Sequence, residues 1–235
     1  MGLMRRLESL LPWATLVAML IAQWLIFVRV PTEAQMGIVQ RIFYFHVGTA
    51  WAAFGCFFVV AGASAVYLWR GSRAADRLAL ASAEVGVLFC TLVLVTGPIW
   101  ARPIWGVWWT WDPRLTMTVI LWAIYAAYLM LRAFGGSDES VSRYAAVLGI
   151  VGVLDIPVIR LSVRLLQGIH PAVLTTREGG SGLTDPTMRL TLYVSSIAIL
   201  LLAGWLVGLR ARAARLESEV TALRREVEAR EGAAA

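Results

Sequence analysis

The sequence predicts an all-α integral membrane protein with six transmembrane helices. Of its 235 residues, 59% are hydrophobic, and the mean hydropathy is +0.72. Only 15% of the residues are charged, and these cluster between long apolar runs. A soluble domain of this length can bury a sizeable core with far fewer apolar residues. The composition and its patterning therefore indicate that lipid surrounds most of the chain.

Six apolar stretches are long enough to cross a hydrocarbon core, which takes about 20 residues per helix. Each must be helical, because the bilayer interior offers no partner to open backbone groups. The fourth stretch is the shortest, and Asp155 and Pro157 leave the outer end of the fifth poorly defined. We predict a membrane domain over residues 1–209, with spans at about 13–30, 45–69, 78–98, 117–132, 144–162 and 190–209.

The first stretch follows a charged start, with Arg5 and Arg6, that resembles the beginning of a signal sequence. The stretch is rather long for the apolar part of a cleaved signal, and no Ala-x-Ala site follows it. We therefore expect it to be retained as the first span.

Arginine supplies all the positive charge, because the chain has no lysine and a net charge of +6. A basic chain can bind nucleic acid. Here, however, the arginines lie at the ends of apolar segments, where they anchor helices in the bilayer, so we predict no nucleic-acid partner. The short loop 70–77 carries three arginines and, with both chain ends, makes one side the more basic. The positive-inside rule then predicts cytoplasmic termini and outer loops at 31–44, 99–116 and 164–189.

The tail, residues 210–235, changes character. Its apolar side chains follow a 4-3-4 spacing, with Glu and Arg on the other faces: Leu216, Val220, Leu223 and Val227. This spacing predicts a short amphipathic or coiled-coil helix on the cytoplasmic side. Two interpretations remain open, a solvated helix that packs weakly on its own protein and a helix that docks on a cytoplasmic partner.

The outer loop 99–116 is rich in tryptophan. Five of the eleven tryptophans lie between Trp100 and Trp111. If residues 105–112 form a helix in the interface plane, Trp111 points elsewhere, and one face is shared by Trp105, Trp108, Trp109 and Asp112. The Asp112–Pro113 pair would end that helix, and Arg114 could pair with an anionic ligand.

Two interpretations fit this cluster. An aromatic belt at headgroup depth is common in membrane proteins. A belt, however, does not require a glycine, an aspartate and four tryptophans within eight residues. A flat aromatic shelf suits a large planar apolar ligand, because stacked rings gain contact area and favourable quadrupole alignment. The sequence favours the ligand platform without excluding the belt.

The two histidines of the chain both fall at the predicted outer surface. His46 lies at the mouth of the second span, and His170 in the last outer loop. Either could be an ordinary hydrogen-bonded interfacial residue. Together they bracket the aromatic shelf, which suggests axial ligation of a haem iron from both faces. Zinc is disfavoured, because no further ligand stands at a suitable spacing. A proton relay through the two histidines is the other alternative.

Asp155 lies within an apolar run, and a carboxylate inside the membrane suggests a function such as proton conduction. The local explanation is that Pro157 leaves backbone carbonyls free nearby and that Arg160, one turn away, pairs with the carboxylate. We favour the local explanation. The chain has no ATP-binding signature, so a partner must supply any energy.

The octapeptide Trp-Gly-Val-Trp-Trp-Thr-Trp-Asp, residues 105–112, resembles the signature of the WWD haem-handling family. The flanking segments 96–100 and 114–116 also fit, and the resemblance covers nearly the whole membrane region. With six spans and only two histidines, the chain is similar to the haem exporter protein C family rather than to the larger cytochrome c synthases. No Cys-x-x-Cys-His motif is present for covalent haem attachment.

This resemblance implies a non-enzymatic protein of the bacterial inner membrane that holds haem b transiently and non-covalently. His46 and His170 would be the axial ligands and the tryptophan segment the platform, while Arg41, Arg102 and Arg114 are candidates, by position, for the propionates. The implied partners are a periplasmic haem chaperone (the E component), an ABC transporter pair (the A and B components) and a small single-span D component. The alternatives are a transport or proton-conducting subunit that uses Asp155 and His46, and a structural anchor for an ABC transporter.

Overall fold

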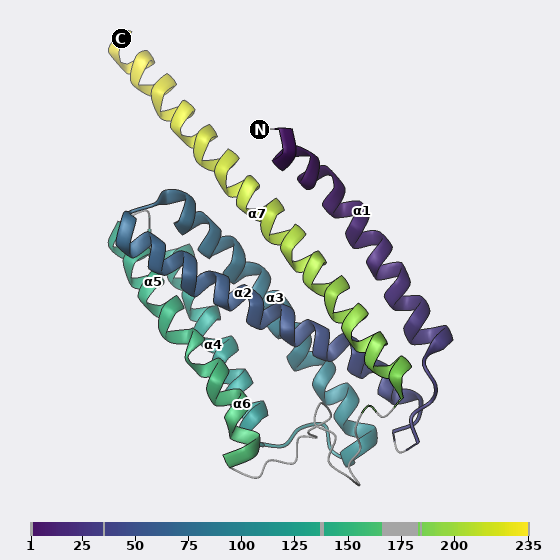
Figure 1. The fold of residues 1–235 in the computed structure, drawn as a ribbon. Helices are drawn as coiled ribbons and strands as arrows, with labels where there is room; N and C mark the ends of the chain where they lie inside the picture. The colour runs from purple at the N-terminus through teal and green to yellow at the C-terminus, as the bar shows by residue number, and fades with distance from the viewer. Residues whose placement is uncertain (1, 35, 137–138, 166–182, 184, 235) are drawn as a thin grey trace.

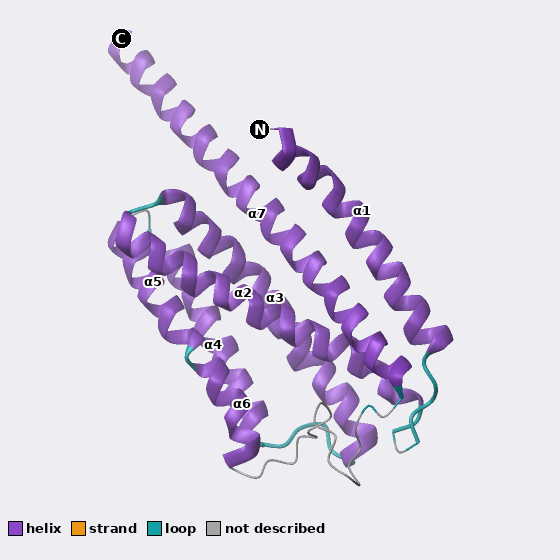
Figure 2. Ribbon diagram, viewed as in Figure 1, coloured by secondary structure: helices purple, strands orange, loops and turns teal. Residues whose placement is uncertain are grey.

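The computed structural model describes residues 2–34, 36–136, 139–165, 183 and 185–234. Nearly all of these residues are helical, and among them only an isolated bridge between Glu33 and Gly37 pairs extended backbone (Figure 2). As the sequence predicts, six helical segments are long and apolar enough to cross a membrane. These segments are Ser9–Arg29, Ile38–Arg70, Arg73–Trp105, Pro113–Phe134, Glu139–Ser162 and Pro186–Glu231.

A hairpin of α2 and α3 forms the centre of the bundle (Figure 1). On one flank α1 lies beside α7, and on the other lie α4, α5 and α6. The α-helices are α1 (Gly2–Trp24), α2 (Arg41–Arg70), α3 (Arg73–Trp105), α4 (Pro113–Phe134), α5 (Glu139–Val153), α6 (Asp155–Leu165) and α7 (Pro186–Ala234). The π-helix η1 (Leu25–Arg29) continues α1, and the 3₁₀ turn η2 (Ile38–Gln40) leads into α2.

The two chain termini lie at the same end of the bundle, as an even number of spans requires (Figure 1). The opposite end, called here the distal end, carries the connections 30–37 and 106–112. Two of the loops predicted to share one membrane face therefore meet at the distal end.

Small residues and stacked rings hold the helices close. A Cβ atom at Gly86 of α3 would lie 2.6 Å from the Phe57 ring of α2, so only glycine permits this approach. Phe57 in turn stacks on Tyr125 of α4 with ring centroids 3.8 Å apart. Near the termini, Arg132 donates to both carboxylate oxygens of Asp76, at 2.8 and 2.9 Å. Because these pairs join different helices, they fix which helices are neighbours.

The fifth span is two helices rather than one. A turn at Leu154 separates α5 from α6, and the Leu154 amide donates to the Val151 carbonyl at 3.1 Å. Pro157 explains the break, because its ring has no N–H and would clash with the carbonyl four residues earlier. In the first turn of α6 the same proline is tolerated.

Three helix boundaries differ from the predicted spans. α3 runs to Trp105, past the expected end at Pro98 and through Pro103. α4 begins at Pro113, within the tryptophan-rich loop, rather than at residue 117. α7 continues without a break from the membrane span into the tail, where Leu216, Val220, Leu223 and Val227 are 48–62% exposed. The first of these differences is the one that builds the site.

Candidate functional site

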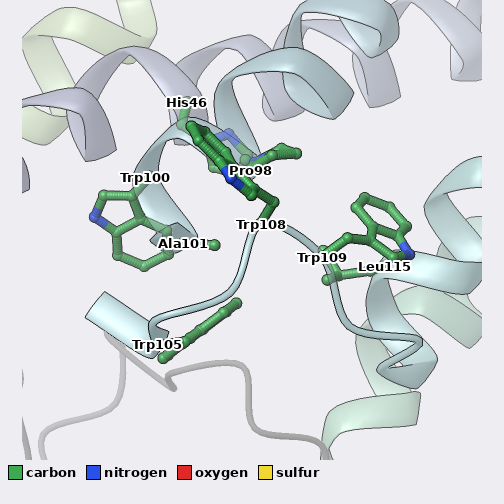
Figure 3. Close-up of a pocket in the computed structure, with 9 residues that line it drawn as sticks. His46, Pro98, Trp100, Ala101, Trp105, Trp108, Trp109 and Leu115 are labelled. Carbon is green, nitrogen blue, oxygen red and sulfur yellow. The ribbon is translucent and has the colours of Figure 1, made fainter. Parts of the chain in front are cut away.

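A pocket opens at the distal end, where the start of α2 meets the end of α3. It encloses about 270 Å³ of empty space, part of it open to the surroundings. Figure 3 shows that its wall is dominated by aromatic rings. The lining residues are His46, Gly97, Pro98, Trp100, Ala101, Trp105, Trp108, Trp109 and Leu115.

The continuous α3 helix supplies one wall of the pocket. Gly97, Ala101 and Trp105 follow one another at four-residue spacing, so they share one face of the helix. The first two are small and leave room beside the ring of the third. Sequence analysis missed this face because it ended the third span at Pro98. The i, i+4 spacing carried the signal, but it counts only if the helix passes through both prolines.

His46 is the ionisable group in the pocket wall. It lies in the second turn of α2, and its side chain is buried, with 9% of its surface exposed. Its Nδ1 atom is 2.9 Å from Oγ1 of Thr96 on α3. Its ring stacks on Trp100 with centroids 6.3 Å apart and planes 26° apart. Contacts from α3 therefore hold the imidazole on two sides.

The tryptophan octapeptide is a loop rather than the helix that we expected. α3 ends after Trp105, where Gly106 takes a left-handed φ of 76°, and residues 107–112 have no regular structure. Asp112 then begins α4 instead of ending a helix, because its side chain accepts a hydrogen bond from the Arg114 amide at 2.9 Å. Pro113 favours this arrangement, because a residue before proline avoids the helical region.

The loop brings together only part of the expected face. Trp105, Trp108 and Trp109 line the pocket, so the grouping of these three does not depend on helical spacing. Trp111 lies outside the lining, is 77% exposed and packs edge-on against Trp109 at 5.9 Å. Asp112 is buried, with 7% exposure, and acts as a helix cap rather than as part of the wall.

The three candidate arginines have different surroundings. Arg102 is exposed, and its guanidinium donates to the Gly106 carbonyl, which closes the end of α3. The Arg41 guanidinium lies 5.9 Å from the centroid of the Phe27 ring. Arg114 precedes the lining residue Leu115, and its charge is within electrostatic range of His46. Of the three, Arg114 is therefore the one associated with the pocket.

The second predicted axial ligand, His170, lies outside the described residues, as does most of the predicted outer loop 164–189. The pairing of the two histidines therefore stays a prediction. Among the residues that the structure describes, no group of three His, Cys, Asp or Glu side chains is placed to hold a metal ion. A metal at this pocket would have to arrive within a larger ligand.

Asp155 lies apart from the pocket lining, at the start of α6. Within the described part of the chain, its buried Oδ2 atom has no hydrogen-bond partner, and no ion pair joins it to Arg160. The ion pair that we expected is therefore not formed there. Arg160 is exposed instead.

These features define a class of protein, a polytopic membrane protein with a histidine-bearing aromatic pocket at one end of its bundle. A family model described as Heme exporter protein C matches residues 1–226. The chain belongs to this family, which confirms the resemblance seen in the sequence.

Relatives described as Heme exporter protein C support the assignment. The protein from Bradyrhizobium diazoefficiens is 36% identical over 173 residues, which cover 73% of this chain and 65% of that protein. The Escherichia coli K12 protein is 33% identical over 205 residues, 86% of this chain and 82% of that protein. The Paracoccus denitrificans protein is 29% identical over 212 residues, 89% and 88% of the two chains. The similarity therefore extends across the membrane region.

Proposed function

We propose that this chain binds haem b non-covalently at the His46 pocket and delivers it to a periplasmic haem chaperone during maturation of c-type cytochromes. One observation carries the proposal: a buried histidine stands in the wall of a recess lined by tryptophans. Membership of a family named for haem export supports haem as the cargo.

The shape of the pocket fits a large planar ligand that is held transiently. Sites that enclose small molecules usually have volumes of about 300–1,000 Å³. The pocket here has about 270 Å³, part of it open, which is enough for one side of a macrocycle. The rings of Trp105, Trp108 and Trp109 offer apolar faces and edges against which a porphyrin can pack. The exposed part of the cargo would then be free to contact a receiving protein.

The axial ligands are the histidines. His46 would bind the iron through the ring nitrogen that does not face Thr96. His170 would supply the second ligand from the last outer loop. Bound haem supplies iron that takes two axial ligands, so the two imidazoles would fix the macrocycle between the aromatic shelf and that loop.

The remaining predicted residues would orient the cargo. Arg114 is the best candidate for a propionate, because it adjoins the pocket wall and a guanidinium binds carboxylates through paired hydrogen bonds. Arg41 and Arg102 already contact Phe27 and the Gly106 carbonyl, so we assign them lesser parts. Trp111 and Asp112 would act through the loop: the first stacks on Trp109, and the second starts α4.

The arrangement in the cell follows from charge and family. We propose that the termini face the cytoplasm of a bacterium and that the distal end faces the periplasm, because the more basic loops lie with the termini. The partners would be the A and B components of an ABC transporter, a small single-span D component and the chaperone. The transporter would supply the energy, and this chain would bind and transfer haem without catalysing a reaction.

Absorption spectra of the purified chain test this proposal. The wild-type protein should carry haem with a low-spin spectrum, and His46→Ala should lose most of it. Because alanine leaves room for a small ligand, added imidazole should partly restore the spectrum, which would separate lost ligation from lost folding. His170→Ala should weaken the spectrum as well. Full haem occupancy and unchanged spectra in both variants would show that the assigned ligation is wrong.

A second candidate, a proton-conducting subunit, is favoured by the buried carboxylate oxygen of Asp155 that has no partner in the described part of the chain. Asp155→Asn distinguishes the two candidates, because it removes a proton carrier while leaving the pocket lining intact. If haem delivery is the function, this variant should keep haem occupancy and cytochrome c maturation near wild type. Loss of maturation with full haem occupancy would favour the proton path.

A further inference from the structure

One hydrogen bond joins the putative site's two central helices at the pocket, between His46 on α2 and Thr96 on α3. The Nδ1 and Oγ1 atoms are 2.9 Å apart. Either atom could be the donor, because a neutral imidazole carries its proton on one nitrogen or the other. The direction matters, because it decides whether the opposite nitrogen, Nε2, has a lone pair for a metal.

The other bonds of Thr96 fix the direction. Its hydroxyl has a single hydrogen, and Oγ1 lies 2.7 Å from the Leu92 carbonyl oxygen in the preceding turn of α3. A second carbonyl, that of Val93, is farther away at 3.5 Å. A carbonyl can only accept, so the hydroxyl hydrogen is directed to Leu92. Oγ1 is then left to accept from Nδ1–H of His46.

We propose that Thr96 is a positioning residue that holds His46 in the tautomer with its proton on Nδ1, which leaves the Nε2 lone pair ready for haem iron. This inference rests on the proposed function. It adds a residue outside the pocket lining and gives it a role through His46. Hydrogen bonds from the second nitrogen of a metal-binding histidine commonly fix the tautomer, orient the ring and raise its basicity.

The rest of α3 holds the ring in the same orientation. Trp100, one turn after Thr96, stacks on the imidazole. A Cβ atom at the intervening Gly97 would lie 3.4 Å from Cε1 of the ring, so this glycine leaves the space that the ring's edge needs. The imidazole is therefore oriented before any ligand arrives, which lowers the entropy lost on binding.

A direct test reads the tautomer in the wild-type protein without haem. The chain has only two histidines, so ¹⁵N-histidine labelling gives two sets of ring signals, and a His170→Gln variant assigns them. At mildly alkaline pH, where a free imidazole is neutral, we expect the His46 signals of the Nδ1–H tautomer. Signals of the Nε2–H tautomer would overturn the proposal, and this measurement requires no substitution at Thr96.

Substitution tests the consequence. Thr96→Val keeps the shape of the side chain but removes the acceptor, and haem affinity should fall about 10- to 100-fold. The midpoint potential of the bound haem should rise, because the imidazole becomes a poorer electron donor. Thr96→Ser should restore both values. The matched control is Thr49→Val on α2, where the lost hydroxyl bonds only the Phe45 carbonyl of its own helix, at 2.6 Å.

The outcomes separate this inference from the function on which it rests. Wild-type affinity and potential in Thr96→Val, together with haem binding that still requires His46, would overturn the role of Thr96 and leave the proposed function standing. A wild-type chain that never binds haem would overturn both. Equal losses in Thr96→Val and Thr49→Val would indicate a general packing effect and would also count against the role.

Discussion

At the scale of single residues, Gly97 gives the most local control over the pocket. Gly97→Val would place additional carbons beside the His46 ring, because even a Cβ atom there lies 3.4 Å from Cε1. Crowding of this kind costs about 1–3 kcal/mol, which corresponds to roughly a 10- to 100-fold loss of haem affinity. Titration of the purified protein with haem measures it.

Gly62 provides the matched control, because it lies on α2 and a Cβ atom there meets nothing within 4 Å. Gly62→Val should therefore keep wild-type affinity, although both variants change helix propensity in the same way. If the two valine variants bind haem equally well, the space beside His46 is not needed for binding.

Asp112 separates a helix-capping role from direct contact with the cargo. Asp112→Ala removes the bond to the Arg114 amide and should destabilise the protein by about 1 kcal/mol, with reduced haem occupancy. Asp112→Asn keeps a good capping group, so both stability and occupancy should stay near wild type. Thermal unfolding in detergent and the haem-to-protein ratio report the two quantities. Reduced occupancy with unchanged stability in Asp112→Asn would indicate direct contact instead.

At the scale of elements, the tail of α7 extends the last membrane span by several turns. Arg210 still belongs to the bundle, because it bonds to both carboxylate oxygens of Glu84 on α3. Beyond it, the apolar side chains of the tail are exposed. Deleting residues 212–235 should therefore leave haem binding intact and weaken assembly with the cytoplasmic ATPase. Copurification of the transporter subunits measures assembly, and loss of the haem spectrum in this truncated chain would contradict the expectation.

The control for the tail is Arg210→Gln, which removes the pairing within the bundle but keeps the tail. We expect lower thermal stability, since Glu84 then loses its partner in a partly buried position. Assembly with the ATPase should change less than in the truncation. A larger assembly defect in Arg210→Gln than in the truncation would place the docking surface in the bundle.

At the scale of the whole molecule, the six spans place the termini at one end of the bundle and the pocket at the other. Cysteine labelling in intact cells tests the orientation. In a Cys56→Ala/Cys90→Ala background, a cysteine replacing the exposed Val107 should react with a membrane-impermeant reagent. A cysteine replacing Ser72, in the arginine-rich loop, should react only after the membrane is opened. The reverse pattern would invert the proposed topology.

The sequence by itself determined the six spans, because apolar runs of sufficient length have no alternative to a helix in lipid. It also indicated His46 and the tryptophans, since an interfacial histidine and a dense aromatic cluster are visible without a fold. Its errors lay at prolines. Pro98 was taken as a helix end, whereas α3 continues to Trp105, and Asp112–Pro113 was taken as a stop, whereas it begins α4.

Only the tertiary structure decided which residues meet. Thr96 and His46 are fifty positions apart, and their hydrogen bond exists because α2 and α3 pack along their length. No local periodicity shows such a contact. The grouping of Trp105, Trp108 and Trp109 likewise came from a loop closed by Gly106 and the Asp112 cap, not from helical spacing. Local chemistry sets helices in a membrane, while the packing between helices positions the side chains of a site.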